Sequence, residues 1–174
     1  DEFGWSRGST AVMLSIHLFV YGCVAPFAGA LSDRWRAKRL ILSGALVMSL
    51  ATASCGLASE LWHLYVIFGV FTPIGLALVG SPLINPTITN WFYKFRGIAF
   101  SLAQMGGGLS FLYAIYAESM ISVFGWRKAY FVLGITLFVI LVPMLLRFYV
   151  YHPREQRLKA LGIEDDIYDE SRRA

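Results

Sequence analysis

The stretch GALSDRWRAKR, residues 29–39, places five charged side chains within seven residues, at 33, 34, 36, 38 and 39. Residues 8–31 on one side and 40–59 on the other contain no Asp, Glu, Lys or Arg. A charged side chain at the centre of a bilayer costs about 3 kcal/mol on insertion scales. The charge cluster is therefore predicted to be a water-facing turn between two helices that cross a membrane.

The rest of the chain repeats this alternation of apolar runs and short charged segments. Of the 174 residues, 57% are hydrophobic and 15% are charged, whereas soluble domains carry about 25% charged residues. Further uncharged runs occupy 64–93, 97–117 and 129–146, and about 20 helical residues cross a hydrocarbon core. A soluble helical core would leave these helices without a polar face. The sequence thus predicts an all-α polytopic membrane bundle over residues 1–151, with spans at about 9–31, 39–59, 63–91, 97–120 and 127–149, followed by a cytoplasmic tail over 152–174.

The basic residues predict the orientation of this bundle. Ten of them lie on the side of the charge cluster, and three lie on the other side, at positions 7, 127 and 128. The ten are Arg34, Arg36, Lys38, Arg39, Lys94, Arg96, Arg147, Arg154, Arg157 and Lys159. Since basic residues favour the cytoplasmic side, we expect a multi-pass protein of the cell membrane, with its N-terminus outside and its C-terminus in the cytoplasm.

Several motifs resemble one family of membrane proteins. Gly29, Leu31, Asp33 and Arg34, followed by Lys38-Arg39, resemble the loop between helices 2 and 3 of the major facilitator superfamily, which reads Gly-x-Leu-x-Asp-Arg-x-Gly-Arg-Lys/Arg. This sequence departs from that pattern at residue 36, where arginine replaces the second glycine. Residues 90–99, 124–127 and 2–7 resemble segments of the monocarboxylate transporters and oxalate/formate antiporters. The resemblance implies helices 2–6 of an N-terminal six-helix half, whose partners are helix 1, the C-terminal half and the lipid bilayer.

The resemblance also implies a function. It is that of a secondary active transporter of small organic anions, monocarboxylates or dicarboxylates, which works by alternating access with proton symport or anion exchange. The alternatives are a transporter of another substrate class, such as a sugar phosphate or a drug, and a non-transporting sensor or partner on the same fold. An enzyme is not expected, because His, Cys and carboxylates do not cluster at ligand or triad spacing. We likewise expect no cofactor, no metal and no nucleic acid.

The charge cluster carries a second hypothesis besides orientation. Asp33 is predicted to lie just beyond the C-terminal end of the first helix and just before the second, where a carboxylate suits the helix N-terminus. The resemblance implies a cytoplasmic latch that forms and breaks during transport. Its residues are Gly29, Asp33, Arg34, Lys38, Arg39 and Arg96. The spacing taken alone favours a loop that only sets the orientation.

Polar residues within the spans are candidates for substrate binding. Tyr113 and Tyr116 follow Gln104 on the fourth span, and Asn85 lies on the third. Tyrosine hydroxyls donate hydrogen bonds to carboxylates, and the rings limit the size of a pocket. These four residues are predicted to line a cavity for a small anion. The alternative places the two tyrosines in the interfacial aromatic belt.

Glu118 and His17 are the candidates for proton coupling. Glu118 is an acid inside an otherwise apolar span, and histidine changes its charge between pH 5 and 8. Each residue also has a structural explanation. Glu118 is expected to pair with Arg127 or Lys128 across a short loop, and a single helical histidine is often hydrogen-bonded within the structure.

Small residues, prolines and the tail complete the predictions. Gly97, Ser101 and residues 106–108 place small side chains on the fourth span, which predicts close packing against a neighbouring helix or, alternatively, bending. Pro73 and Pro86 are predicted to interrupt the third span. Residues 153–161 are predicted to form a short surface helix.

Overall fold

The structure, a computed structural model, describes residues 7–108, 110–153, 158, 160 and 161, with the side chains of Arg7 and Asp33 outside the description. The first two long helices are α1 (Arg7–Arg34) and α2 (Ala37–Cys55). The third span is built from α3 (Leu61–Val66), the π-helix η1 (Ile67–Phe71), α4 (Thr72–Val79) and α5 (Ser81–Trp91). The fourth comprises α6 (Arg96–Gly108) and α7 (Ser110–Phe124), and the fifth is α8 (Trp126–Phe148).

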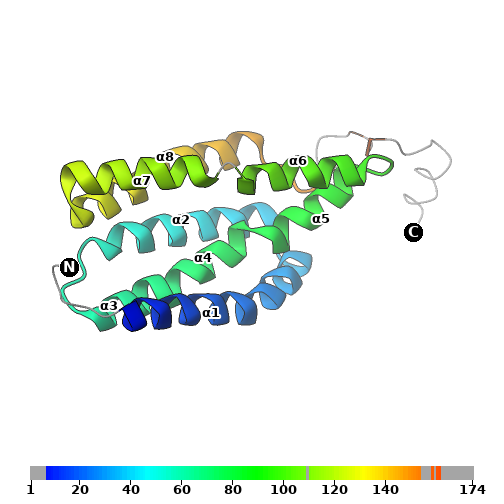
Figure 1. The fold of residues 1–174 in the computed structure, drawn as a ribbon. Coiled ribbons are helices and arrows are strands. Elements are labelled where there is room, and N and C mark those ends of the chain that lie inside the picture. Colours follow the sequence, from blue (N-terminus) through cyan, green and yellow to red (C-terminus); the bar gives the residue numbers. More distant parts are fainter. Residues whose placement is uncertain (1–6, 109, 154–157, 159, 162–174) are drawn as a thin grey trace.

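Five of these helical segments are long and apolar enough to cross a membrane. They are Gly8–Ser32, Ala37–Cys55, Leu61–Trp91, Arg96–Phe124 and Trp126–Phe148. Helices suit these sequences because a bilayer offers no water to hydrogen-bond the backbone, so each segment satisfies its own N–H and C=O groups. The predicted all-α polytopic bundle is confirmed. Successive spans run antiparallel, so α1 begins and α8 ends at opposite ends of the bundle (Figure 1).

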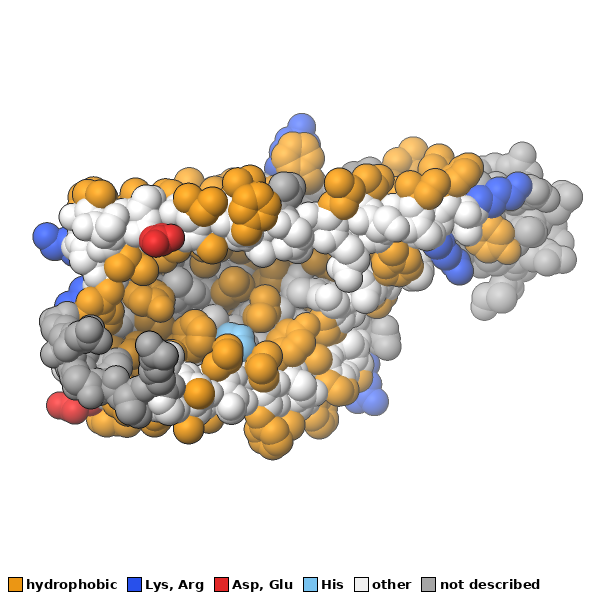
Figure 2. Space-filling view, in the orientation of Figure 1, with side chains coloured by type: hydrophobic (Ala, Val, Ile, Leu, Met, Phe, Trp, Pro, Cys, Tyr) orange, Lys and Arg blue, Asp and Glu red, His pale blue; other side chains and the backbone are white. Residues whose placement is uncertain are grey.

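The surface of the bundle is apolar along the helices. On the face shown in Figure 2, hydrophobic side chains cover the helices, and the coloured charged side chains lie mainly towards the two ends. Phe19 and Phe27 on α1 are 72% and 75% exposed. A soluble protein rarely presents such a continuous apolar surface, whereas a bilayer solvates it.

Helix α2 lies at the centre of the packing. It contacts α4 on one side and α8 on the other, α1 packs against η1 and α4, and α7 packs against α8 (Figure 1). A core cluster joins four of these elements and consists of Ala28, Leu40, Ile41, Ala77 and Leu83. The order of neighbours across the bundle is therefore α1, α4, α2, α8, α7.

Three glycines permit these helices to approach closely. A Cβ atom at Gly75 would lie 2.6 Å from the Met48 backbone nitrogen, and one at Gly44 would lie 2.9 Å from the Gly75 carbonyl oxygen. On the other side of α2, a Cβ atom at Gly134 would lie 2.6 Å from the Ala53 nitrogen. Small residues allow the backbones of membrane helices to come into contact, so α4 and α8 both pack on α2 through glycine.

The predicted small-residue face of the fourth span packs differently. A Cβ atom at Gly97, Gly106, Gly107 or Gly108 would meet nothing within 4 Å. No residue of α6 is buried, and among the described elements α6 packs mainly against α5 and α7. The prediction that these glycines pack closely against a neighbouring helix is wrong within the described residues.

The third span is irregular at two places. The first is η1, where the N–H of Thr72 bonds to the carbonyl of Ile67, five residues back, and Pro73 follows directly. The second is Gly80, whose ψ of −155° ends α4 before Ser81-Pro82 begins α5. Pro86 lies inside α5, so Gly80, and not Pro86, separates the two helices.

The turn between α1 and α2 is tight. Helix α1 continues to Arg34, and the Trp35 N–H bonds to the Leu31 carbonyl at 2.9 Å. Asp33 therefore lies within the last turn of α1, and the prediction that it follows the helix is wrong. Arg36 precedes α2 with φ −64° and ψ 108°. Because this φ is negative, the turn does not require the glycine of the family pattern.

Candidate functional site

Tyr113 and Tyr116 both reach from α7 to α8. The Tyr113 hydroxyl donates to the Leu133 carbonyl at 3.3 Å, and the Tyr116 and Thr136 oxygens lie 3.2 Å apart. Thr136 donates its own hydrogen to the Val132 carbonyl at 2.8 Å, so the Tyr116 hydroxyl is the donor in the pair. The two tyrosine rings lie 5.9 Å apart. The structure thus brings the tyrosines together as a link between two helices.

The other two predicted substrate residues lie elsewhere. Gln104 is exposed on α6, and Asn85 is exposed on α5. Among the described contacts, none joins either residue to the tyrosines. The four predicted ligands therefore do not form one pocket within the part of the chain that the structure describes.

The two proton-coupling candidates have different surroundings. His17 is half-buried on α1, where its Nδ1 atom lies 2.9 Å from the Phe68 carbonyl oxygen of η1. Glu118 is exposed on α7. The expected ion pair of Glu118 with Arg127 or Lys128 does not form within the described part of the chain, and the Arg127 guanidinium lies 4.6 Å from the centre of the Trp126 ring.

The basic residues of the predicted latch do not form one cluster. Lys38 donates to the Leu146 carbonyl at 2.9 Å, near the end of α8. Arg96 donates from Nε to the Phe92 carbonyl at 2.9 Å, and its guanidinium lies 5.5 Å from the centre of the Tyr93 ring. Arg34 and Arg39 are exposed, and Gly29 lies inside α1. Lys38 thus joins two helices, and Arg96 binds the turn before its own helix.

A polar seam joins the end of α5 to the segment that follows α8, and sequence reasoning missed it. Trp91 Nε1 donates to the Val150 carbonyl at 2.9 Å, and Asn90 Nδ2 donates to the Tyr151 carbonyl at 3.4 Å. One turn earlier, the Thr87 and Tyr149 hydroxyl oxygens lie 2.9 Å apart. Thr87 donates to the Leu83 carbonyl, so Tyr149 is the donor to Thr87.

The same seam continues at Leu161. Its N–H donates to the Trp91 carbonyl at 2.8 Å, and its carbonyl accepts from the Tyr93 N–H at 2.9 Å. Leu158, Ala160 and Leu161 lie outside any helix. The predicted helix over 153–161 is wrong for these three residues, because backbone pairing with the turn after α5 holds Leu161 extended; residues 154–157 and 159 lie outside the described part.

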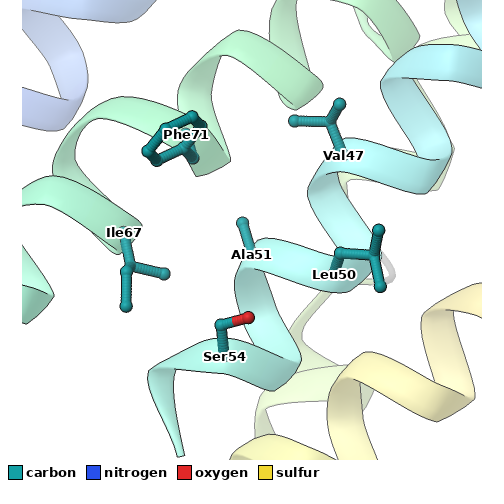
Figure 3. A pocket seen from close by; sticks show the side chains of 6 residues that line it. All are labelled: Val47, Leu50, Ala51, Ser54, Ile67 and Phe71. Carbon is teal, nitrogen blue, oxygen red and sulfur yellow. The ribbon is translucent and has the colours of Figure 1, made fainter. Parts of the chain in front are cut away.

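One apolar hollow lies between α2 and η1 (Figure 3). Its volume is about 400 Å³, and it is lined by Val47, Leu50, Ala51, Ser54, Ile67 and Phe71. The Ser54 hydroxyl is the single polar side-chain group in this lining, and none of the predicted substrate residues contributes to it. A carboxylate needs several donors, so this hollow does not suit a small anion. Within the described residues, no group of three His, Cys, Asp or Glu side chains could hold a metal ion.

Comparison with known proteins decides the family. A sequence profile of the Major Facilitator Superfamily matches residues 1–166, which is nearly the whole chain. The chain belongs to the major facilitator superfamily. Its multi-pass helical architecture is therefore that of a membrane transporter family, as the charge-cluster motif predicted.

Individual relatives narrow the branch of this superfamily. The chain is 34% identical over 170 residues to monocarboxylate transporter 11 of Homo sapiens, an alignment that covers 94% of this chain and 36% of the relative. It is 32% identical over 133 residues to monocarboxylate transporter 12 of Homo sapiens, covering 76% and 26%. An uncharacterized MFS-type transporter, YcxA of Bacillus subtilis (strain 168), is 27% identical over 155 residues, covering 88% and 38%. The chain thus spans less than two fifths of the length of these relatives.

Proposed function

We propose that this chain is part of a secondary active transporter of small organic anions, monocarboxylates or dicarboxylates, that works by alternating access. The observation that carries the proposal is the similarity to two proteins named monocarboxylate transporters, over 94% and 76% of this chain. The proposed orientation in the cell membrane places residue 7 outside and the segment after α8 in the cytoplasm, because the basic residues gather at the latter end. Transport is coupled to proton symport or to anion exchange.

The complete transporter is proposed to include a preceding helix and a C-terminal half. Two observations support these partners. The relatives are more than twice as long as the matched region, and the glycine face of α6 has no helix against it among the described elements. A segment packed on that face would bury glycines that now meet nothing within 4 Å.

Tyr113, Tyr116, Gln104 and Asn85 are proposed to contribute donors to the substrate. The hydrogen bonds of the two tyrosines to α8 measure 3.3 and 3.2 Å, which is long for an O–H···O bond. A carboxylate oxygen is a stronger acceptor than a carbonyl or a threonine hydroxyl. A substrate between the halves would therefore compete for these hydroxyls.

Uptake into liposomes that contain the full-length protein tests this function. Labelled lactate, formate and oxalate are offered with and without an outside-acid gradient, and with and without internal anion. Uptake of one of these anions supports the proposal, and the conditions separate symport from exchange. Absence of uptake for all three anions overturns the carboxylate assignment. The remaining alternatives are then a transporter of another substrate class and a non-transporting sensor.

The latch is tested in the same liposomes. Gly29, Asp33, Arg34, Lys38, Arg39 and Arg96 are proposed to form and break cytoplasmic contacts during transport. Asp33→Asn removes the one acid of this set and is expected to abolish uptake. Arg36→Gln, a neighbouring exposed charge outside the set, is the matched control and is expected to retain uptake. Equal activity of the two variants would contradict the latch.

A further inference from the structure

The third span contains a carbonyl that its own helix leaves without a donor. At the end of η1 the Thr72 N–H bonds to the Ile67 carbonyl, five residues back. The next N–H in this register belongs to residue 73 and would bond to the Phe68 carbonyl. Residue 73 is proline, which has no N–H. Since an unpaired carbonyl within a membrane costs several kcal/mol by transfer estimates, Phe68 requires a donor from another element.

His17 of α1 supplies that donor. Its Nδ1 atom lies 2.9 Å from the Phe68 oxygen, and its ring centre lies 5.0 Å from that of Phe68, with 32° between the ring planes. A carbonyl oxygen only accepts, so Nδ1 carries the hydrogen. The lone pair of the neutral ring is then on Nε2. The backbone of η1 thereby selects the tautomer of His17 and leaves one ring nitrogen as a base.

No charged side chain of the packed elements is placed to neutralise His17. Helices η1, α4 and α5 contain no titratable side chain. In α3, the Tyr65 hydroxyl donates to the carbonyl of Ser9, which lies about two turns before His17 on α1. The His63 ring accepts a hydrogen bond from the Glu60 N–H. The buried thiol of Cys55 and the Tyr130 ring of α8 pack in the same cluster as Phe68, and neither is a charged group. Tyr21 packs in the cluster of Ala28 and Leu40. The described basic side chains of α1 and α2, Arg34, Lys38 and Arg39, lie at the last turn of α1 and the first turn of α2.

We propose that Nε2 of His17 is the proton-accepting atom of proton-linked transport. This inference rests on the proposed carboxylate transport and assigns its coupling residue. A proton from the outer solution binds the Nε2 lone pair, which gives an imidazolium with hydrogens on both nitrogens. The same proton leaves from Nε2 to the cytoplasm and restores the neutral ring. Nδ1 keeps its hydrogen bond to Phe68 throughout.

The proton matches the substrate in charge, and the hydrogen bond to Phe68 links it to the packing of two helices. One imidazolium charge offsets the charge of one monocarboxylate, so the loaded site is neutral overall. Protonation also makes the bond to the Phe68 carbonyl charge-assisted, and such bonds are roughly twice as strong as neutral ones. Helix α1 is then held more tightly to the π-helix when the proton is bound. Glu118 offers no such connection, because it is exposed on α7.

Three variants of the full-length protein in liposomes test the assignment. His17→Asn keeps an amide donor close to the position of Nδ1 but cannot take up a proton. His17→Leu removes both properties, and Glu118→Gln neutralises the other candidate. Lactate uptake driven by an outside-acid gradient is compared with lactate–lactate exchange, which requires no net proton movement.

We expect His17→Asn to lose gradient-driven uptake while retaining exchange, which also shows that the variant is folded. Glu118→Gln is expected to retain both activities, and His17→Leu to lose gradient-driven uptake. Gradient-driven uptake by His17→Asn overturns the assignment. If the wild-type protein exchanges lactate but the gradient has no effect on its uptake, the role of His17 is overturned and carboxylate transport is retained. If the wild-type protein transports none of the anions, both the role of His17 and carboxylate transport are overturned. Nitrogen-15 NMR of the same protein at high pH must show hydrogen on Nδ1 of His17, and hydrogen on Nε2 instead contradicts the proposed tautomer.

Discussion

The second and fourth spans have similar composition and opposite surroundings. In the most apolar 18-residue stretch of α2, 39% of the residues are buried inside the bundle. In that of Arg96–Phe124, the buried share is 6%. Both spans contain glycines or small residues at short intervals. The difference arises because α2 has α4 and α8 against its two sides, and α6 has no helix against its glycine face among the described elements. Small residues permit close packing, but only a neighbouring helix makes use of them.

The largest expected effect is that of a side chain added in the packed region. Gly75→Leu would force a Cβ atom to within 2.6 Å of the Met48 nitrogen, and backbone cannot move aside as a side chain can. Overpacking of this kind is expected to destabilise the protein by about 3 kcal/mol. SDS-induced unfolding in mixed micelles, followed by circular dichroism, measures the loss. Gly22→Leu on α1, where an added Cβ atom would meet nothing within 4 Å, is the control. Similar losses in the two variants would contradict the close backbone contact assigned to Gly75.

A smaller effect is expected where α1 meets η1. His17→Leu leaves the Phe68 carbonyl without its donor, which is expected to cost about 2 kcal/mol. Adding Pro73→Ala restores an N–H at residue 73 and should recover part of that stability. The same unfolding assay compares the single and double variants. If Pro73→Ala brings no recovery in the His17→Leu background, the missing proline N–H is not the reason for the His17 bond.

The polar seam predicts an effect of about 1 kcal/mol. Tyr149→Phe removes the donor to Thr87, and Thr87→Val removes the acceptor together with the bond to Leu83. Since the two residues share one hydrogen bond, the double variant should lose less stability than the sum of the single variants. A double-mutant cycle from unfolding curves measures this coupling. Strict additivity would mean that the bond contributes nothing.

The smallest effect belongs to the sparsely packed fourth span. Tyr116→Phe removes one hydrogen bond between α7 and α8, and such bonds between membrane helices average about 0.6 kcal/mol. The same substitution is expected to raise the KM for lactate, because the Tyr116 hydroxyl is a proposed donor to the substrate. Tyr130→Phe on α8 is a control outside the proposed ligand set. Unchanged KM in Tyr116→Phe would assign this tyrosine to helix packing alone.

Charge distribution made the fold predictable, because charges are excluded from the bilayer and mark the ends of the spans. The individual packing contacts were not predictable in this way. The triplet at 106–108 attracted the packing prediction, whereas the glycines that touch another backbone, Gly44, Gly75 and Gly134, stand singly in their helices. Which glycine meets a partner depends on tertiary arrangement, and composition does not contain that information.

The candidate site was predictable in its residue types and not in its partners. Tyrosine hydroxyls and a histidine were expected to be functional, but their acceptors are backbone carbonyls and a threonine on other helices. Phe68 gave no signal, because its role comes from a carbonyl and not from its side chain. Pro73 was the available signal: a proline inside a span leaves a carbonyl that some donor must satisfy.

The π-helix has a consequence for how this span is aligned with others. Each residue of an α-helix advances by about 100° around the axis. The turn in η1 closes back to the fifth residue before it, so it absorbs one extra residue, and the sequence positions that share one face are offset by one residue after it. The faces of α3 and α4 therefore follow two different angular frames. If residues 67–71 were α-helical at the same length, Gly75 would be rotated by about 100° away from Met48. The wide turn of η1, more than the identity of any residue in it, therefore keeps the third span packed on α2.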